Sequence, residues 1–143
     1  MELKSFLFHF FALLYKNNLI EQQINKSLLT VNTMDKIKSV LNYINEHYTE
    51  DISINTLANI CDYSEYHFMR FFKKHIGLTC IQYINNYRLE KASILLTTSN
   101  NAIMDISLEV GFDNLSYFNK LFKRKYNLTP KEFRLLNGIY LKN

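Results

Sequence analysis

The chain has 143 residues, 48% of them hydrophobic and 15% aromatic, so it can bury a core and is not a disordered tail. Only three Gly and one Pro are present, too few turn formers for an all-β chain, and apolar residues recur at helical spacing, which predicts an all-α class. The formal net charge of +4 permits nucleic-acid binding without requiring it.

The N-terminal segment, residues 1–33, is expected to form an apolar helix followed by a polar stretch. Glu2 to Lys16 suits one helix, and Asn17 to Asn32 suits a second short helix or a linker. The apolar run from Phe6 to Tyr15 is too short to span a bilayer, which takes about 20 residues. It has no basic leader or cleavage site, so we expect neither export nor membrane insertion. The apolar stripe within residues 3–15 either associates with another copy of the chain or folds back on its own domain.

The next stretch predicts three helices. From Asp35 to Tyr48, apolar residues at helical spacing predict an amphipathic helix that ends in an acidic turn. A short helix, a turn and a longer helix are then expected over residues 53–77. Ser53 and Ser64 suit the N-caps of these two helices, and Gly77 suits the left-handed residue at the end.

The remaining stretch predicts four more helices. A long helix is expected over residues 79–97, opened by a capping box of Thr79 with Gln82. Another short helix, turn and longer helix follow over residues 102–127, and a final helix over residues 130–137. We therefore expect about seven helices, preceded by the short N-terminal helical segment.

The two helix pairs are copies of each other. An offset of 49 matches Ile54 with Ile103, Leu57 with Ile106 and Cys61 with Val110, and after the turn an offset of 50 matches Phe68 with Phe118, Phe71 with Leu121, Phe72 with Phe122, Lys73 with Lys123 and Lys74 with Arg124. Two repeats are too few for a solenoid, so they indicate a paired module. A short helix, a tight turn and a longer helix is the helix-turn-helix plan, and the turn residues Asp62 and Gly111 tolerate a left-handed backbone.

The longer helix of each copy separates a core face from an outward face. The aromatic positions of the repeat gather on one side, and the opposite sides are cationic and able to form hydrogen bonds. Arg and Lys can donate to guanine in the major groove, and Asn can pair with adenine. On one helix, a solvated basic face would explain this equally well, but two such faces at equivalent positions favour DNA recognition.

The outward side chains are the candidates for DNA contact. The base-edge candidates are Tyr66, Met69 and Arg70 in the first copy and Ser116, Asn119 and Lys120 in the second. The phosphate candidates, where charge matters and base sequence does not, are Lys73, Lys74, Lys123, Arg124 and Lys131. Leu115 lies at the edge between core and groove, with core packing favoured. Arg88 is either a phosphate contact or a partner of an acid such as Asp105, and His75 and Lys125 are expected to extend outward.

No catalytic or metal-binding pattern occurs in the sequence. Cys61 and Cys80 are isolated in apolar contexts, so we expect buried thiols in a reducing cytoplasm. The four His residues have no metal-binding spacing, and neither a Gly-rich phosphate loop nor a Ser/His/Asp set is present. We therefore expect a protein that is not an enzyme and binds no cofactor, metal ion or small-molecule ligand.

The most specific motif is the run from Asp105 to Lys123 together with the run from Leu128 to Arg134. With support from Ser64 to Lys74, these residues make the stretch from about Asp35 to Leu136 resemble the DNA-binding domain of AraC/XylS-type transcription regulators. The resemblance implies two helix-turn-helix subdomains joined by a long linker helix, whose recognition helices enter adjacent major-groove segments about one helical turn apart. It also implies a promoter regulator that often activates by touching RNA polymerase.

The expected organisation is thus a helical segment over residues 1–33, interpreted as the remnant of a sensor or dimerisation domain, and an AraC-type domain over residues 34–143. The predicted function is a sequence-specific regulator of transcription, an activator, that binds double-stranded promoter DNA in the cytoplasm, at the nucleoid. The alternative is a helical protein-interaction module or an antagonist of a related regulator. The apolar stripe of residues 3–15 favours this alternative, and the two basic faces count against it.

Overall fold

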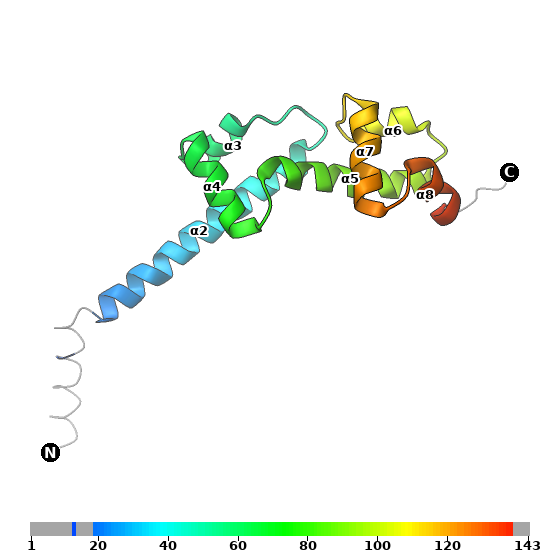
Figure 1. Cartoon of the computed structure of the whole chain (residues 1–143). Helices are drawn as coiled ribbons and strands as arrows, with labels where there is room; N and C mark the ends of the chain where they lie inside the picture. Colours follow the sequence, from blue (N-terminus) through cyan, green and yellow to red (C-terminus); the bar gives the residue numbers. More distant parts are fainter. Residues whose placement is uncertain (1–12, 14–18, 139–143) are drawn as a thin grey trace, which may run out of the picture. The chain divides into compact units, whose positions relative to one another are not determined.

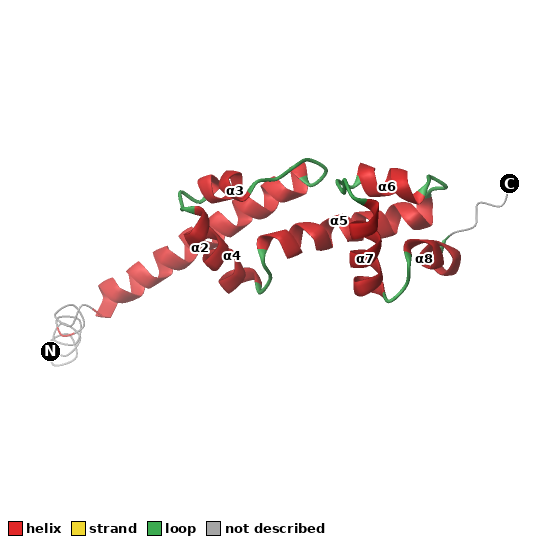
Figure 2. Cartoon of the chain, turned by 45° about the horizontal axis from the view of Figure 1, so that its top comes forward, coloured by secondary structure: helices red, strands yellow, loops and turns green. Residues whose placement is uncertain are grey.

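The computed structural model describes residue 13 and residues 19–138 of the chain. Within these residues it contains seven helices and no strand, which confirms the expected all-α class (Figures 1 and 2). The helices are α2 (Leu19–His47), α3 (Ile54–Ile60), α4 (Glu65–Ile76), α5 (Cys80–Thr98), α6 (Ile103–Glu109), α7 (Leu115–Tyr126) and α8 (Pro130–Asn137). None of these described helices combines the length and apolar character needed to cross a membrane.

The chain divides into two compact units, residues 1–39 and residues 40–143, and α2 runs across the division. We expected a polar linker or short helix up to Asn32 and a separate helix from Asp35, but α2 is continuous. Neither Gly nor Pro occurs within α2, so nothing interrupts its backbone hydrogen bonds. The apolar segment of residues 3–15 lies outside the described residues, except for Leu13.

In the unit of residues 40–143, the helix ends form where the capping residues predict them. Ser53 and Ser64 accept hydrogen bonds from the backbone N–H groups of Thr56 and His67. Complete capping boxes open α5 and α8, at Thr79 with Gln82 and at Thr129 with Glu132. Four residues adopt positive φ at the turns and helix ends, namely Asp62, Gly77, Gly111 and Asn127. Both helix pairs therefore begin and end as the sequence indicated.

The internal repeat reappears in the packing of α3 with α4, the first helix pair, and of α6 with α7, the second helix pair. The rings of Phe68 and Phe72 have centroids 5.7 Å apart at 48°, and those of Phe118 and Phe122 are 5.6 Å apart at 49°. All four side chains are fully buried. The core around the second pair consists of Leu89, Ala92, Leu96, Ile106, Val110, Phe112, Phe118, Leu121 and Phe122. Since α5 contributes the first three, the linker helix is part of this core.

Candidate nucleic-acid interface

The first candidate surface is the outward side of α4. Its opposite side is buried through Phe68, Phe71 and Phe72, as the repeat predicted. Tyr66 and Met69 are 67% and 47% exposed, although both are large side chains that would otherwise favour burial. Arg70 is also exposed, so the structure places the three base-edge candidates of the first pair on one accessible face.

Tyr66 and Arg70 form a pair that the sequence analysis did not foresee. The Arg70 guanidinium donates a hydrogen bond from Nη1 to the Tyr66 hydroxyl at 3.2 Å, and its carbon lies 5.6 Å from the ring centroid. The two residues are four apart and so share one helix face. The spacing of four residues was already visible in the sequence and indicated that the two side chains could meet. The pair holds the guanidinium on the outward face, where its other N–H groups remain available as donors.

Two histidines of α4, His67 and His75, were not among the candidate contacts. His67 stacks on Tyr63 with ring centroids 4.1 Å apart and an interplanar angle of 6°, and His75 lies 4.8 Å from Phe71. Both histidines are exposed, which agrees with the outward direction expected for His75. A hollow of about 550 Å³ beside α4 is lined by Tyr66, His67, Arg70, Phe71, Lys74 and His75. The flank of α4 is therefore aromatic and basic.

The second candidate surface is the outward side of α7. Asn114 caps this helix by accepting a hydrogen bond from the backbone N–H of Tyr117 at 2.8 Å. Ser116 and Lys120 are exposed, whereas Asn119 is half-buried and so less accessible than the other candidates. The buried side is formed by Phe118, Leu121 and Phe122, and Leu115 at the edge is 36% exposed. The equivalent helices of the repeat thus expose equivalent faces.

The phosphate candidates lie near the ends of these helices. The last turn of α4 contains Lys73 and Lys74, and the last turn of α7 contains Lys123 and Arg124. Lys131 follows in the first turn of α8, and all five side chains are exposed. Cations in the last turn of a helix are stabilised by its dipole, so the four side chains at the ends of α4 and α7 carry charge without weakening those helices.

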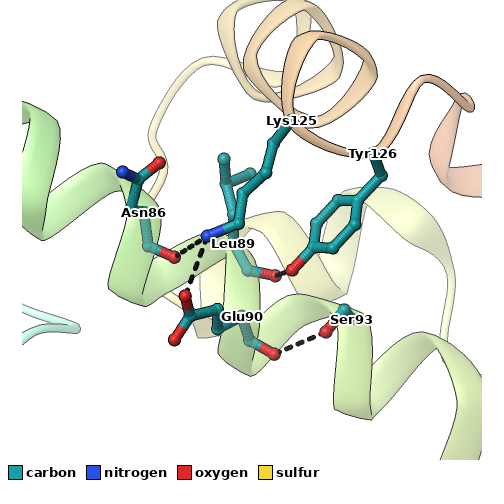
Figure 3. Close-up of polar contacts among 6 residues, drawn as sticks. All are labelled: Asn86, Leu89, Glu90, Ser93, Lys125 and Tyr126. Atoms are coloured by element: carbon teal, nitrogen blue, oxygen red, sulfur yellow. Dashed lines mark hydrogen bonds and ion pairs between the residues drawn. The ribbon is translucent and has the colours of Figure 1, made fainter.

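Lys125 does not extend outward as the sequence suggested. It is half-buried, and its Nζ donates to Glu90 Oε1 at 2.8 Å and to the Asn86 carbonyl at 3.3 Å (Figure 3). Next to it, the Tyr126 hydroxyl donates to the Leu89 carbonyl at 3.5 Å (Figure 3). Because all three acceptors belong to α5, Lys125 and Tyr126 together attach α7 to α5.

Among the described residues, Arg88 forms no ion pair with Asp105. Its half-buried guanidinium donates to the carbonyl oxygens of Tyr48 and Glu50. Burial lowers the pKa of Arg88, and the charges of Asp51 and Asp113 oppose that shift. The acceptors are backbone atoms that become neighbours of α5 only in the fold, which is why sequence spacing could not identify them.

Both cysteines are buried, as expected, and neither forms a disulfide. Burial raises the pKa of the Cys80 thiol to about 12, which keeps it protonated. Within the part of the chain that the structure describes, no group of three or more His, Cys, Asp or Glu side chains is placed to hold a metal ion.

Comparison with known proteins identifies the family of this fold. The family model described as a helix-turn-helix domain matches residues 57–135. The bifunctional transcriptional activator/DNA repair enzyme AdaA of Bacillus subtilis is 41% identical over 98 residues, which are 68% of this chain and 46% of AdaA. This chain therefore spans less than half the length of that relative.

Two solved structures extend the comparison. The C-terminal domain of the response regulator yesN from Fusobacterium nucleatum is 34% identical with a TM-score of 0.63, over 66% of this chain and 93% of that one. The DNA-binding domain of the global transcriptional factor AdpA, solved with a target DNA, is 25% identical with a TM-score of 0.66, over 70% of this chain and 90% of that one. The chain belongs to the AraC/XylS-type family of helix-turn-helix transcription regulators.

Proposed function

We propose that this protein is a sequence-specific transcription regulator that inserts α4 and α7 into adjacent major-groove segments of promoter DNA. The observation that carries the proposal is the repeated surface: two equivalent helices bury apolar side chains at the same three positions and expose cationic, hydrogen-bonding faces. A solvated basic face explains one such helix, but it does not explain a second one at repeat-equivalent positions.

The exposed side chains match the chemistry of base edges. Arg70 and Lys120 are suited to the O6 and N7 acceptors of guanine, and Asn119 to the donor and acceptor of adenine. Tyr66 and Met69 offer apolar contact to a thymine methyl group, and Ser116 can donate or accept a hydrogen bond. Phosphates are assigned to the other five candidates, Lys73, Lys74, Lys123, Arg124 and Lys131.

Activation is the proposed outcome of binding. Support for activation comes from AdaA, which is described as a transcriptional activator, and support for DNA binding comes from AdpA, whose similar domain was solved with a target DNA. RNA polymerase is the proposed second partner, since an activator bound at a promoter acts by contacting it. The proposed role is regulatory and not enzymatic, and its place is the nucleoid of a bacterial cytoplasm. A promoter-reporter fusion that gains expression when the protein is supplied would support activation, and one that loses expression would indicate repression.

The direct test of DNA binding is selection of bound sequences from random duplex DNA. We expect enrichment of two short blocks whose centres lie about 10 base pairs apart, the spacing of one helical turn. Affinity for the selected site should then be measured at two salt concentrations. Binding through several phosphates should weaken steeply as salt rises, because counterions are released from the DNA.

A protein-interaction role is the second candidate. The first part of α2, taken by itself, exposes the apolar side chains of Ile24, Leu28, Val31 and Met34, an arrangement typical of helices that pair with another surface. Absence of an enriched sequence, together with an association that does not depend on salt, would favour this role over DNA binding.

Self-association through residues 3–15 is a separate part of the proposal. It is supported by the apolar stripe in the sequence and by Leu13, which is 46% exposed. Sedimentation of the full chain should show a dimer that the substitution Leu13→Glu weakens. A monomer at all concentrations would remove this part and leave the DNA-binding proposal intact.

A further inference from the structure

Arg88, near the middle of α5, holds the segment that leads into the first helix pair. Its Nε donates to the Tyr48 carbonyl at 2.6 Å, and its Nη2 donates to the Glu50 carbonyl at 2.7 Å. Both acceptors lie between the end of α2 and the start of α3. A guanidinium donates along fixed directions in one plane, so two bonds to two carbonyls define the position of this segment against α5.

The same guanidinium also touches the turn of the second helix pair. Its carbon lies 5.8 Å from the ring centroid of Phe112, a side chain that is 3% exposed and belongs to the core of that pair. Gly111 is equally close, because a Cβ at this position would lie 2.9 Å from Arg88 Nε and 2.7 Å from the Tyr48 carbonyl oxygen. Arg88 therefore contacts both the segment that leads into the first helix pair and the turn of the second pair.

Arg134 provides an internal comparison. Its Nε donates to the Leu96 carbonyl at 3.3 Å and its Nη2 to the Asn101 carbonyl at 2.6 Å, which holds the segment leading into α6. The two arginines thus play the same part, one for each helix pair. The bonds of Arg134, however, join only α8 to the end of α5 and the segment after it, whereas Arg88 also reaches the turn of the other pair.

We propose that Arg88 is a positioning residue that fixes the spacing of the two helix pairs and thereby the spacing of the two DNA half-sites that the protein accepts. Only the second part of this proposal, the spacing of the half-sites, rests on the proposed DNA-binding function. The first part, the spacing of the two helix pairs, concerns the free protein. Without the Arg88 guanidinium, Gly111 and the Tyr48 carbonyl lose the side chain that contacts both of them, and the two helix pairs can shift along α5.

The first part can be tested without DNA by measuring the distance between spin labels on the two helix pairs. Suitable sites are Asn55 in α3 and Met104 in α6, which are exposed, repeat-equivalent and outside the DNA-contact candidates. Cysteines introduced there can be labelled selectively because both native thiols are buried. We expect Arg88→Ala to broaden the distance distribution and Arg134→Ala, the matched control, to leave its width unchanged. An unchanged width in Arg88→Ala would overturn the inference.

The second part is tested with the selected DNA site and versions in which one base pair is added or removed between the half-sites. We expect the natural protein to lose about tenfold in affinity on each change, because the DNA must twist to compensate. In Arg88→Ala, the loss of affinity on changing the spacing should fall to about twofold, whereas in Arg134→Ala it should stay near tenfold. A general loss of stability would not produce this contrast between the two variants. If Arg88→Ala discriminates between the DNA spacings as strongly as the natural protein does, the proposal is refuted.

Arg88→Lys provides a milder variant if Arg88→Ala does not fold. An ammonium group can reach one carbonyl but lacks the planar fork that reaches two, so the same changes are expected at smaller size. If the natural protein binds no DNA, the proposed function fails, while the label distances still decide whether Arg88 fixes the spacing.

Discussion

Gly111 and Arg88 are packed so closely that no side chain fits between them. A Cβ at position 111 would lie 2.9 Å from Arg88 Nε and 2.7 Å from the backbone oxygen of Tyr48, and φ at this residue is +95°. The long arginine side chain can move, but the backbone oxygen cannot do so without displacing the end of α2. Gly111 is therefore needed for two reasons, its conformation and its lack of volume.

We predict that Gly111→Ala lowers the free energy of unfolding by about 2 to 4 kcal/mol, the sum of left-handed strain and overpacking. Gly77→Ala is the matched control, because Gly77 has φ +82° but nothing within 4 Å of its Cβ position. This control should cost about 1 kcal/mol, from backbone strain alone. Urea unfolding of both variants measures the difference, and equal losses would show that the segment around Tyr48 yields easily.

The second prediction concerns the core of the second helix pair. Phe118 is fully buried, so Phe118→Ala should lower the free energy of unfolding by about 3 to 5 kcal/mol through lost burial and a cavity. Its neighbour Tyr117 is 44% exposed and accepts a hydrogen bond from Asn85 Nδ2 at 3.1 Å. Tyr117→Phe should therefore cost only about 1 kcal/mol. An unaltered melting temperature in Phe118→Ala would contradict the assigned core face of α7.

The third prediction tests the base-edge candidates. Arg70→Ala and Lys120→Ala should each weaken binding to the selected site by about 1 to 3 kcal/mol, relax the preference at one position and leave the melting temperature unchanged. Tyr66→Phe removes the hydroxyl that accepts from Arg70 while keeping the ring, so a smaller loss is expected. Fluorescence anisotropy with the selected duplex measures these changes. Natural affinity in Arg70→Ala and Lys120→Ala would remove both residues from the list of base contacts.

The fourth prediction separates phosphate contacts from base contacts. Lys123→Ala should weaken binding to all sequences alike and reduce the slope of log affinity against log salt by about 1. Lys91 serves as the control, since its Nζ lies over the rings of Tyr87 and Tyr48, at 5.1 and 6.0 Å from their centroids. Lys91→Ala should leave the slope unchanged. Equal slopes for the natural protein and Lys123→Ala would mean that this lysine meets no phosphate.

Local chemistry explains why the helix ends of residues 40–143 were predictable. Ser53, Ser64 and Thr79 cap helices through bonds to residues three positions away, so sequence spacing alone contains the signal. The continuity of α2 was missed because Asn17 to Asn32 is a polar stretch containing Asn and Gln, a composition that suits a linker as well as a short helix. No Gly or Pro interrupts the stretch, so the helix continues through it.

The contacts that join the helix pairs were not predictable in this way. The two acceptors of Arg88 lie 40 and 38 residues before it, and the Glu90 partner of Lys125 lies 35 residues away. A single sequence gives no periodicity that connects such positions. The candidate DNA-contact surface was predictable because each half lies on one helix, whereas the residues that hold the halves together come from separate elements.

The last prediction uses the buried thiol of Cys80, whose pKa burial raises from 9.0 to about 12. In the unfolded chain this thiol ionises near pH 9, whereas in the folded protein it keeps its proton. Between pH 9 and 12 the folded state therefore binds more protons, and stability is lost as pH rises through this window. For one group the loss is about 1.4 kcal/mol per pH unit.

Other groups titrate in the same range, so Cys80→Ala, which lacks the thiol, is the control. Urea unfolding between pH 8 and 11 should show the natural protein losing stability faster than this variant above pH 9, and parallel curves would mean that the thiol ionises as easily folded as unfolded.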